Sequence, residues 1–103
     1  MSFTLHQDLQ ASRLKLEGQF TFEAHTQFRS ATQEVLDATA AGPITLDLSG
    51  LSYLDSSALG MLLLLREKAE SKGLRVVLGK PSPVVMEILK IVQFGKLFEI
   101  QEG

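Results

Sequence analysis

The apolar residues of this 103-residue chain change their spacing repeatedly, from a two-residue period to a three- to four-residue period and back. The two-residue period is typical of strands, and the longer period is typical of helices packed on one face. Strand-like and helix-like segments therefore alternate along the sequence. This order predicts an α/β domain in which helices connect parallel strands through right-handed crossovers.

The first part of the chain predicts an antiparallel pair followed by a helix. Residues 3–5 and 12–16 alternate apolar and polar side chains, as half-buried strands do, and we expect Gly18 to end the second strand. Residues 24–40 are rich in Ala, Gln, Glu and Leu and have apolar side chains at helical spacing. We expect this helix to end at Gly42-Pro43.

The middle of the chain predicts a strand, a turn and a strongly apolar helix. Residues 44–48 alternate as in a strand, and we expect a turn at residues 49–50 before a second apolar stretch at 51–54. A helix is expected to begin near Ser56 and to end before Gly73, since glycine readily adopts the left-handed conformation that stops a helix.

The last part predicts two more strands with a helix between them. Residues 74–78 read as a buried parallel strand, and residues 97–100 as a final short strand. Between them, Ser82 is expected to cap a helix that has Pro83 at its first position. We therefore expect one domain over residues 1–103, with a mixed sheet of four to five strands and about three to four helices.

Composition narrows the classes of function. The net charge is −2 and there is no basic stripe, so we expect no direct nucleic-acid partner. The chain has no cysteine, which is compatible with the reducing cytosol, and its N-terminus lacks the features of a signal peptide. The longest apolar run, residues 61–65, is far shorter than the roughly 20 residues that span a bilayer. We expect a cytoplasmic protein that does not insert into membranes.

The residues that enzymes use form no recognisable arrangement. His6 and His25, the two histidines, do not belong to a nucleophile motif. The acidic residues form no metal-like cluster, and no phosphate-binding glycine-rich loop is present. Asp47 is interpreted as an exposed strand residue or a neighbour of the turn. We therefore expect no enzymatic activity, no metal and no cofactor.

The expected start of the middle helix carries the polar residues Asp55, Ser56 and Ser57. Each of them could cap the helix, because a short side-chain oxygen accepts a bond from a free N–H of the first turn. Ser56 could instead be a regulatory switch. A phosphate at a helix start lies near unpaired N–H groups and the positive end of the helix dipole, so the fold could carry it.

The helix that follows this turn has almost no polar side over its first two turns. Its apolar ring could be buried between the sheet and neighbouring helices, or part of it could form an exposed patch that a protein partner covers. Phosphorylation of Ser56 would add about −1.5 to −2 charges, and burying those charges under a partner without a matching cation costs several kcal/mol. Modification could thus end an interaction while the domain stays folded.

Residues 46–60, Leu-Asp-Leu-Ser-Gly-Leu-Ser-Tyr-Leu-Asp-Ser-Ser-Ala-Leu-Gly, resemble the signature of STAS domains, especially the bacterial anti-sigma factor antagonists. Residues 18–21, Gly-Gln-Phe-Thr, occupy the place of the family's Gly-Glu-Leu-Asp segment. Residues 74–79, Ser82-Pro83 and residues 94–98 are similar to its closing strand, helix and short strand. The resemblance covers nearly the whole chain.

This resemblance implies a protein that binds an anti-sigma factor and thereby frees a sigma factor. Ser56 matches the serine that family members have phosphorylated, often by the anti-sigma partner acting as a serine kinase, and a serine phosphatase resets the switch. The chain would be a substrate with no catalytic residue of its own. We expect its partner-binding residues to be Thr21, Asp55, Ser56, Ser57, Leu59, Gly60 and Leu63.

Three residues differ from the family pattern. Thr21 replaces the usual aspartate and Gln19 a common glutamate, which removes acidic groups near the turn and could alter recognition by the kinase. Ala58 replaces a frequent glycine. A second hypothesis is a constitutive docking subunit, such as the STAS component of a membrane lipid-transport complex, which would bind through the same surface without phosphorylation. The modifiable serine of Asp55-Ser56-Ser57 favours the regulatory hypothesis.

Overall fold

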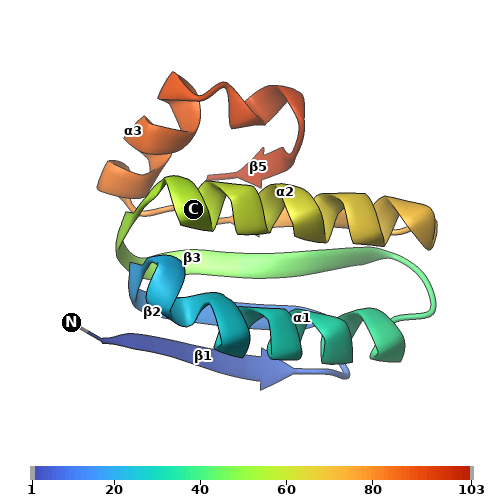
Figure 1. Cartoon of the computed structure of the whole chain (residues 1–103). Coiled ribbons are helices and arrows are strands. Elements are labelled where there is room, and N and C mark those ends of the chain that lie inside the picture. Colours follow the sequence, from blue (N-terminus) through green and yellow to red (C-terminus); the bar gives the residue numbers. More distant parts are fainter. Residues whose placement is uncertain (1, 103) are drawn as a thin grey trace.

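The computed structural model of the chain describes residues 2–102. Within them, five strands form one sheet in the order β1-β2-β3-β4-β5, and three α-helices pack around it (Figure 1). Two single-turn 3₁₀ helices complete the fold. The elements are β1 (Phe3–Asp8), β2 (Arg13–Phe20), η1 (Phe22–Ala24), α1 (His25–Ala38), β3 (Pro43–Leu54), α2 (Ser56–Ser71), β4 (Arg75–Gly79), α3 (Pro83–Ile91), η2 (Phe94–Lys96) and β5 (Glu99–Gln101).

The sheet is mixed, as the sequence predicts. β1 pairs with β2 in the antiparallel direction, whereas β2, β3, β4 and β5 are parallel. Each parallel connection contains a helix, because parallel neighbours require a crossover long enough to return to the starting edge. The single α/β domain with five strands and three α-helices confirms the predicted fold class.

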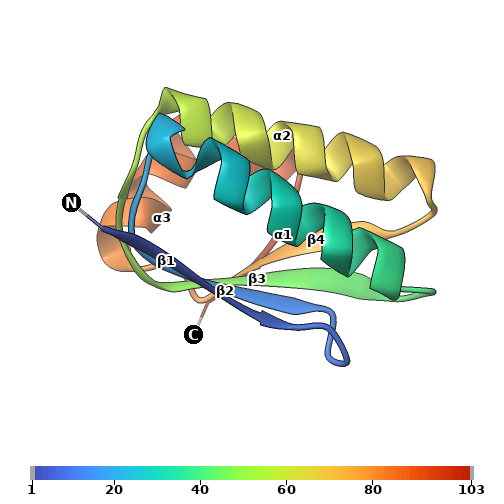
Figure 2. The ribbon, with the colours of Figure 1, turned by 60° about the horizontal axis from the view of Figure 1, so that its bottom comes forward.

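The core lies between the sheet and the helices. α1 and α2 run side by side over the same face of the sheet (Figure 2). Alternate side chains of β2 and β3, including Leu14, Leu16 and Leu46, point into this core and are fully buried. Arg13 and Lys15 alternate with them and are exposed on the other face. The two-residue period of the sequence thus corresponds to the two faces of the sheet.

β2 does not end at Gly18, contrary to the sequence-based expectation. The strand continues to Phe20, and Gly18 lies opposite Phe3 with a φ of +91°. A Cβ atom there would collide with the carbonyl oxygen of Ser2, and the N–H of Gln19 donates to that oxygen at 2.9 Å. Glycine therefore lets the strand pass through an irregular register while staying paired.

The turn predicted at residues 49–50 is also wrong, because β3 is a single strand of 12 residues. Gly50 stays paired with Glu17 of β2, where the register between the strands shifts. A Cβ on Gly50 would lie 2.7 Å from the Cγ of Glu17. The glycine thus marks a close approach between strands rather than a change of direction.

The helix boundaries agree closely with the predictions. α2 begins at Ser56 and ends at Ser71, and Gly73 follows with a φ of +74°. α3 begins at Pro83 after Ser82, but the Ser82 side chain does not cap it. Its hydroxyl donates instead to the carbonyl oxygen of Leu51 at 2.6 Å. The serine therefore ties the start of α3 to β3.

Candidate functional site

Two strand ends bring the predicted site residues to one edge of the sheet. Phe20 and Leu54, the last residues of β2 and β3, are paired. The N–H of Asp55 donates to the carbonyl oxygen of Phe20 at 3.1 Å, which extends the pairing by one bond. Thr21 and the β3–α2 turn therefore leave the sheet next to each other, as parallel strands require.

Asp55, rather than either serine, caps α2. Its Oδ1 accepts a hydrogen bond from the N–H of Ala58 at 2.9 Å, and its main-chain oxygen accepts one from Leu59 at 3.2 Å. The hydroxyls of Ser56 and Ser57 make no hydrogen bond to another residue within the described part of the chain. The capping role that the sequence left open among three residues thus belongs to one of them.

Ser56 is the first residue of α2 and its side chain is exposed, whereas Ser57 is half-buried. The N–H groups of the first helical turn point toward this end of the helix, where the aligned peptide dipoles place a partial positive charge. The Asp55 carboxylate beside it carries the opposite charge. An added phosphate on Ser56 would therefore meet a favourable backbone and one like-charged neighbour.

The exposed side of α2 extends from Ser56 through Gly60 to Leu63, at the spacing that aligns residues on one helix face. Leu63 is 39% exposed, and Leu59 is half-buried against the core. A Cβ on Gly60 would contact nothing within 4 Å. Packing within the domain therefore does not require a glycine there, although a helical glycine costs about 1 kcal/mol relative to alanine.

The sequence allowed the apolar ring of α2 to be buried in the core or exposed to a partner, and the structure shows that part of it is buried and part is exposed. Ala58, Leu62 and Leu65 are buried in the core. Leu63 and Leu64 are exposed, so part of the ring is available for contact with another molecule. Burial and exposure thus coexist on one helix, because a single sheet face can cover only one side of it.

Two exposed aromatic residues that lie beside the turn were not identified from the sequence. Phe22 directly follows Thr21 and is 65% exposed, with its ring stacked on His25 at a centroid distance of 5.6 Å. Tyr53 precedes the turn on β3 and is also exposed. Large aromatic side chains are enriched at protein interfaces, and their position next to Thr21 and Asp55 was the signal that could have identified them.

Thr21 is half-buried and precedes η1, but its side chain makes no capping hydrogen bond. It lines a small surface hollow of about 160 Å³ together with Gln19 and Glu23. The threonine therefore lies next to the turn, as predicted, and places no charge there. Glu23 is the acidic side chain in this hollow.

Asp47 is buried, which corrects its interpretation as an exposed strand residue. Its Oδ1 accepts hydrogen bonds from the N–H and the hydroxyl of Ser49, at 3.0 and 2.7 Å. Burial by itself raises the pKa of the Asp47 carboxyl, but the two bonds from Ser49 and the charges of Lys15 and Arg13 outweigh it and lower the pKa. Asp47 thus stays ionised as part of the sheet.

Within residues 2–102, no three His, Cys, Asp or Glu side chains are grouped so that they could hold a metal ion. No helix in this part of the chain combines the length and the apolar character needed to cross a membrane.

Comparison with known proteins identifies relatives of the whole fold. The family model described as "Mlab, STAS domain" matches residues 3–100. A STAS-domain containing protein of Pseudomonas aeruginosa (strain UCBPP-PA14) is 43% identical over 93 residues, which cover 90% of each chain.

Solved structures with the same fold include two forms of one regulator. The anti-sigma factor antagonist SpoIIAA in its unphosphorylated form matches with a TM-score of 0.71 and 24% identity, over 99% of this chain and 89% of that one. The Bacillus cell fate determinant SpoIIAA in the phosphorylated form matches with a TM-score of 0.67 and 21% identity, over 96% and 90%. At these identities the similarity establishes the fold.

Proposed function

This chain belongs to the STAS-domain family, and we propose that it is a regulatory binding protein of the anti-sigma factor antagonist type, controlled by phosphorylation of Ser56. The unmodified protein binds an anti-sigma factor, which is itself a serine kinase or is accompanied by one. Phosphorylation releases the partner, and a serine phosphatase restores binding. The protein acts in the cytoplasm, without catalytic activity and without direct contact to nucleic acid.

The exposed Ser56 hydroxyl is the observation that carries this proposal. Asp55 caps the helix, so the fold does not use the Ser56 side chain for any hydrogen bond within the described residues. A kinase could therefore reach the hydroxyl, and its modification would break no internal contact. Two of the structural neighbours are phosphorylated and unphosphorylated forms of one protein with this fold, which supports a fold that tolerates the modification.

Electrostatics explains how modification could release a partner. Phosphate adds about −1.5 to −2 charges at neutral pH. The helix end offsets part of that charge, equivalent to roughly +0.5, while Asp55 adds to it. Leu63 and Gly60 continue the same face with no cation. A partner that covers this face would therefore have to bury an uncompensated anion, at a cost of several kcal/mol.

The primary test is the intact mass of the protein recovered from its native cells, with peptide mapping of the turn. Trypsin releases residues 30–66 as one peptide, so fragment ions must separate Ser56 from Ser52 and Ser57. We expect one phosphate on Ser56 that disappears when the phosphatase is active. Ser56→Ala should abolish the modification, and the matched control Ser57→Ala should retain it. An unmodified Ser56 under every growth condition would overturn the proposal.

Exposed Leu63 and Leu64 favour a second candidate, the constitutive docking subunit of a membrane lipid-transport complex. An apolar helix face can hold a permanent partner without any modification. The modification state separates the two candidates, because a switch requires a phosphate on Ser56 in some growth condition, whereas a permanent partner binds a protein whose Ser56 is never modified. Gene neighbours that encode a kinase-like anti-sigma protein and a phosphatase would favour the switch, whereas transporter genes would favour docking.

A further inference from the structure

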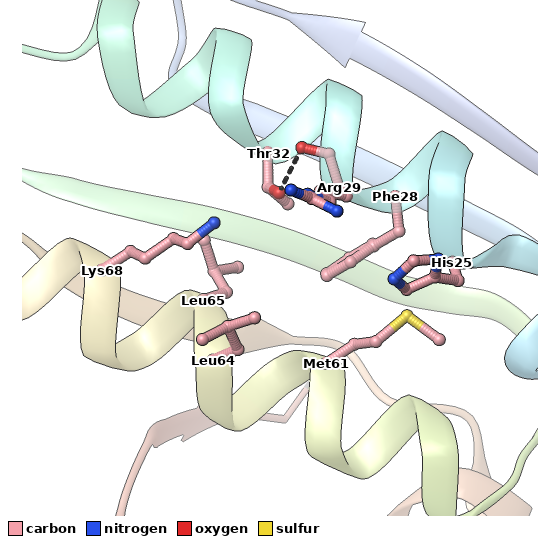
Figure 3. Close-up of a pocket in the computed structure, with 8 residues that line it drawn as sticks. All are labelled: His25, Phe28, Arg29, Thr32, Met61, Leu64, Leu65 and Lys68. Atoms are coloured by element: carbon pink, nitrogen blue, oxygen red, sulfur yellow. Dashed lines mark hydrogen bonds between the residues drawn. The ribbon is translucent and has the colours of Figure 1, made fainter.

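The gap between α1 and α2 forms a second surface, which the proposed switch does not use. Phe28 of α1 and Met61 and Leu65 of α2 line its floor, and exposed Leu64 lies at its rim (Figure 3). Met61 and Leu65 lie on the side of α2 that faces α1, whereas Ser56 and Gly60 of the same helix are exposed to solvent. We call this surface the α1–α2 groove.

Cationic side chains border the groove. Figure 3 shows the guanidinium of Arg29 and the ammonium of Lys68 above the gap between the helices. Within residues 2–102, neither has a carboxylate at ion-pair distance, although Arg66 and Lys72 of the same region pair with Glu70 and Asp37. The rim of the groove therefore carries two positive charges that the domain itself does not neutralise.

An acidic side chain, Glu34, adjoins this rim without forming an ion pair with it. Glu34 lines a hollow that adjoins the groove and shares Arg29 and Lys68 with it. The Glu34 carboxylate accepts a hydrogen bond at 2.6 Å from the side-chain amide of Gln7, on β1. The Glu34 carboxylate is thus directed to β1, and among the described residues it forms no ion pair with Arg29 or Lys68, which can pair with carboxylates from another molecule.

The size of the groove excludes a small enclosed ligand. The cavity itself holds about 40 Å³, little more than one water molecule and far less than the roughly 150 Å³ that accommodates benzene. Its lining residues repeat at helical spacing along both walls, from His25 to Thr32 and from Met61 to Lys68. Seven residues of helix span about 10 Å, which suits the side chains of another helix laid along the surface.

We propose that the α1–α2 groove docks an acidic amphipathic helix of a protein partner. Apolar side chains of that helix contact Met61 and Leu64, and its carboxylates pair with Arg29 and Lys68. Charge complementarity selects this occupant, because a basic or neutral helix would leave the rim uncompensated. Docking does not require phosphorylation of Ser56, so it is independent of the proposed switch.

The test uses the full chain and a designed peptide of about 18 residues, long enough to form a helix. The peptide has Leu at helical spacing on one face and Glu on the other, and a matched peptide has Lys in place of Glu. Titration is followed by NMR with labelled methionine methyl groups, so that Met61 reports on the groove and Met86 serves as an internal reference. We expect a saturable shift of the Met61 methyl with the acidic peptide, weakened by salt.

Charge-reversal variants test whether Arg29 and Lys68 at the rim are responsible for binding of the acidic peptide. The double variant Arg29→Glu/Lys68→Glu should weaken binding of the acidic peptide at least about tenfold. Lys90→Glu/Lys96→Glu makes the same change of net charge on α3 and η2 and should leave the affinity within about twofold. Exposed Leu64→Ala, which tests the apolar contact without changing charge, should weaken binding by several-fold. Circular dichroism of each variant checks that the domain remains folded.

Several results would overturn the proposal. Equal binding of the acidic and basic peptides, or equal loss in both charge-reversal variants, would exclude charge complementarity at the groove. Binding to vesicles of anionic phospholipid, with no shift from the acidic peptide, would identify a lipid surface instead. A shift of Met61 that depends on protein concentration alone would identify a second copy of the chain as the occupant.

Discussion

One aspartate–serine pair lies within β3 and a second lies at the turn that follows it, and the two behave in opposite ways. At Asp47 and Ser49, both donors of the serine bond to the carboxylate, and the pair is part of the sheet. At Asp55 and Ser56, the carboxylate caps the helix through Ala58, and the serine hydroxyl remains exposed. An aspartate and a serine thus have a structural role where they hydrogen-bond to each other. Where the aspartate bonds to a different residue, the serine hydroxyl is available for modification.

Of all changes to the two aspartate–serine pairs, phosphorylation of Ser56 should have the largest effect, and that effect should be on partner binding. If the switch is correct, the phosphorylated protein should lose its partner by about a hundredfold in affinity, because several kcal/mol oppose burial of the added charge. Ser56→Asp should reproduce part of the loss and Ser56→Ala should bind constantly, as measured by co-purification from native cells. Undiminished binding by both the phosphorylated protein and Ser56→Asp would exclude the electrostatic mechanism.

Replacement of either residue of the Asp47–Ser49 pair should affect stability and leave the partner bound. We expect Asp47→Asn to lower the free energy of unfolding by about 1.5 kcal/mol at neutral pH, since hydrogen bonds to a charged group are lost or weakened. Chemical denaturation measures the change, and Ser49→Ala should show the same direction. If the Asp47→Asn variant folded but lost its partner, the Asp47–Ser49 pair would also contribute to the binding surface.

The stability difference between the wild type and Asp47→Asn should also depend on pH. The pKa of Asp47 is lowered in the folded state from an ordinary value of 3.8. Its ionised form therefore stabilises the fold at pH values above 3.8, and this contribution is lost as the pH falls through the lower, folded-state pKa. The two denaturation curves should converge in strong acid. A constant difference at every pH would exclude ionisation as the cause.

Removal of the helix cap should distinguish Asp55, at the start of α2, from Asp47 within β3. We expect Asp55→Ala to destabilise the domain by about 1 kcal/mol through loss of the bond from Ala58. Asp55→Asn, which retains a capping oxygen, should recover most of that stability in thermal unfolding. If the alanine variant were as stable as the wild type, Asp55 would not be the cap, and Ser56 could no longer be regarded as free.

Gly60→Ala should have the smallest effect on stability, and it should stabilise the domain rather than destabilise it. The added methyl group meets nothing in the domain, so helix stability should rise by about 0.5–1 kcal/mol. If this face of α2 contacts a partner closely, binding should weaken even as the melting temperature increases. Unchanged partner binding would place Gly60 outside the interface and would limit the surface to the region around Ser56.

Local signals were sufficient for the helices and for the position of the candidate switch. The Asp55-Ser56-Ser57 turn and Gly73 predicted the limits of α2, because capping and left-handed glycine act within a few residues. Signals from Gly18 and Gly50 were misread as a strand end and a turn. Both glycines instead permit close approach between strands, a property that depends on residues far away in the sequence.

The sequence by itself determined the order of strands and helices along the chain, the apolar face of each helix and the position of the Asp55-Ser56-Ser57 turn, because residue spacing and local hydrogen bonding dictate them. The place where Thr21 meets Asp55 depends instead on the pairing of β2 with β3. Only the tertiary structure decided which carboxylate uses which donor, whether Asp47 is buried and where the α1–α2 groove opens. Each of these features depends on pairing between distant segments, so no local pattern contains it. The exposed hydroxyl of Ser56 depends on both, because the sequence places a serine at the start of the helix and the folded structure assigns the cap to Asp55.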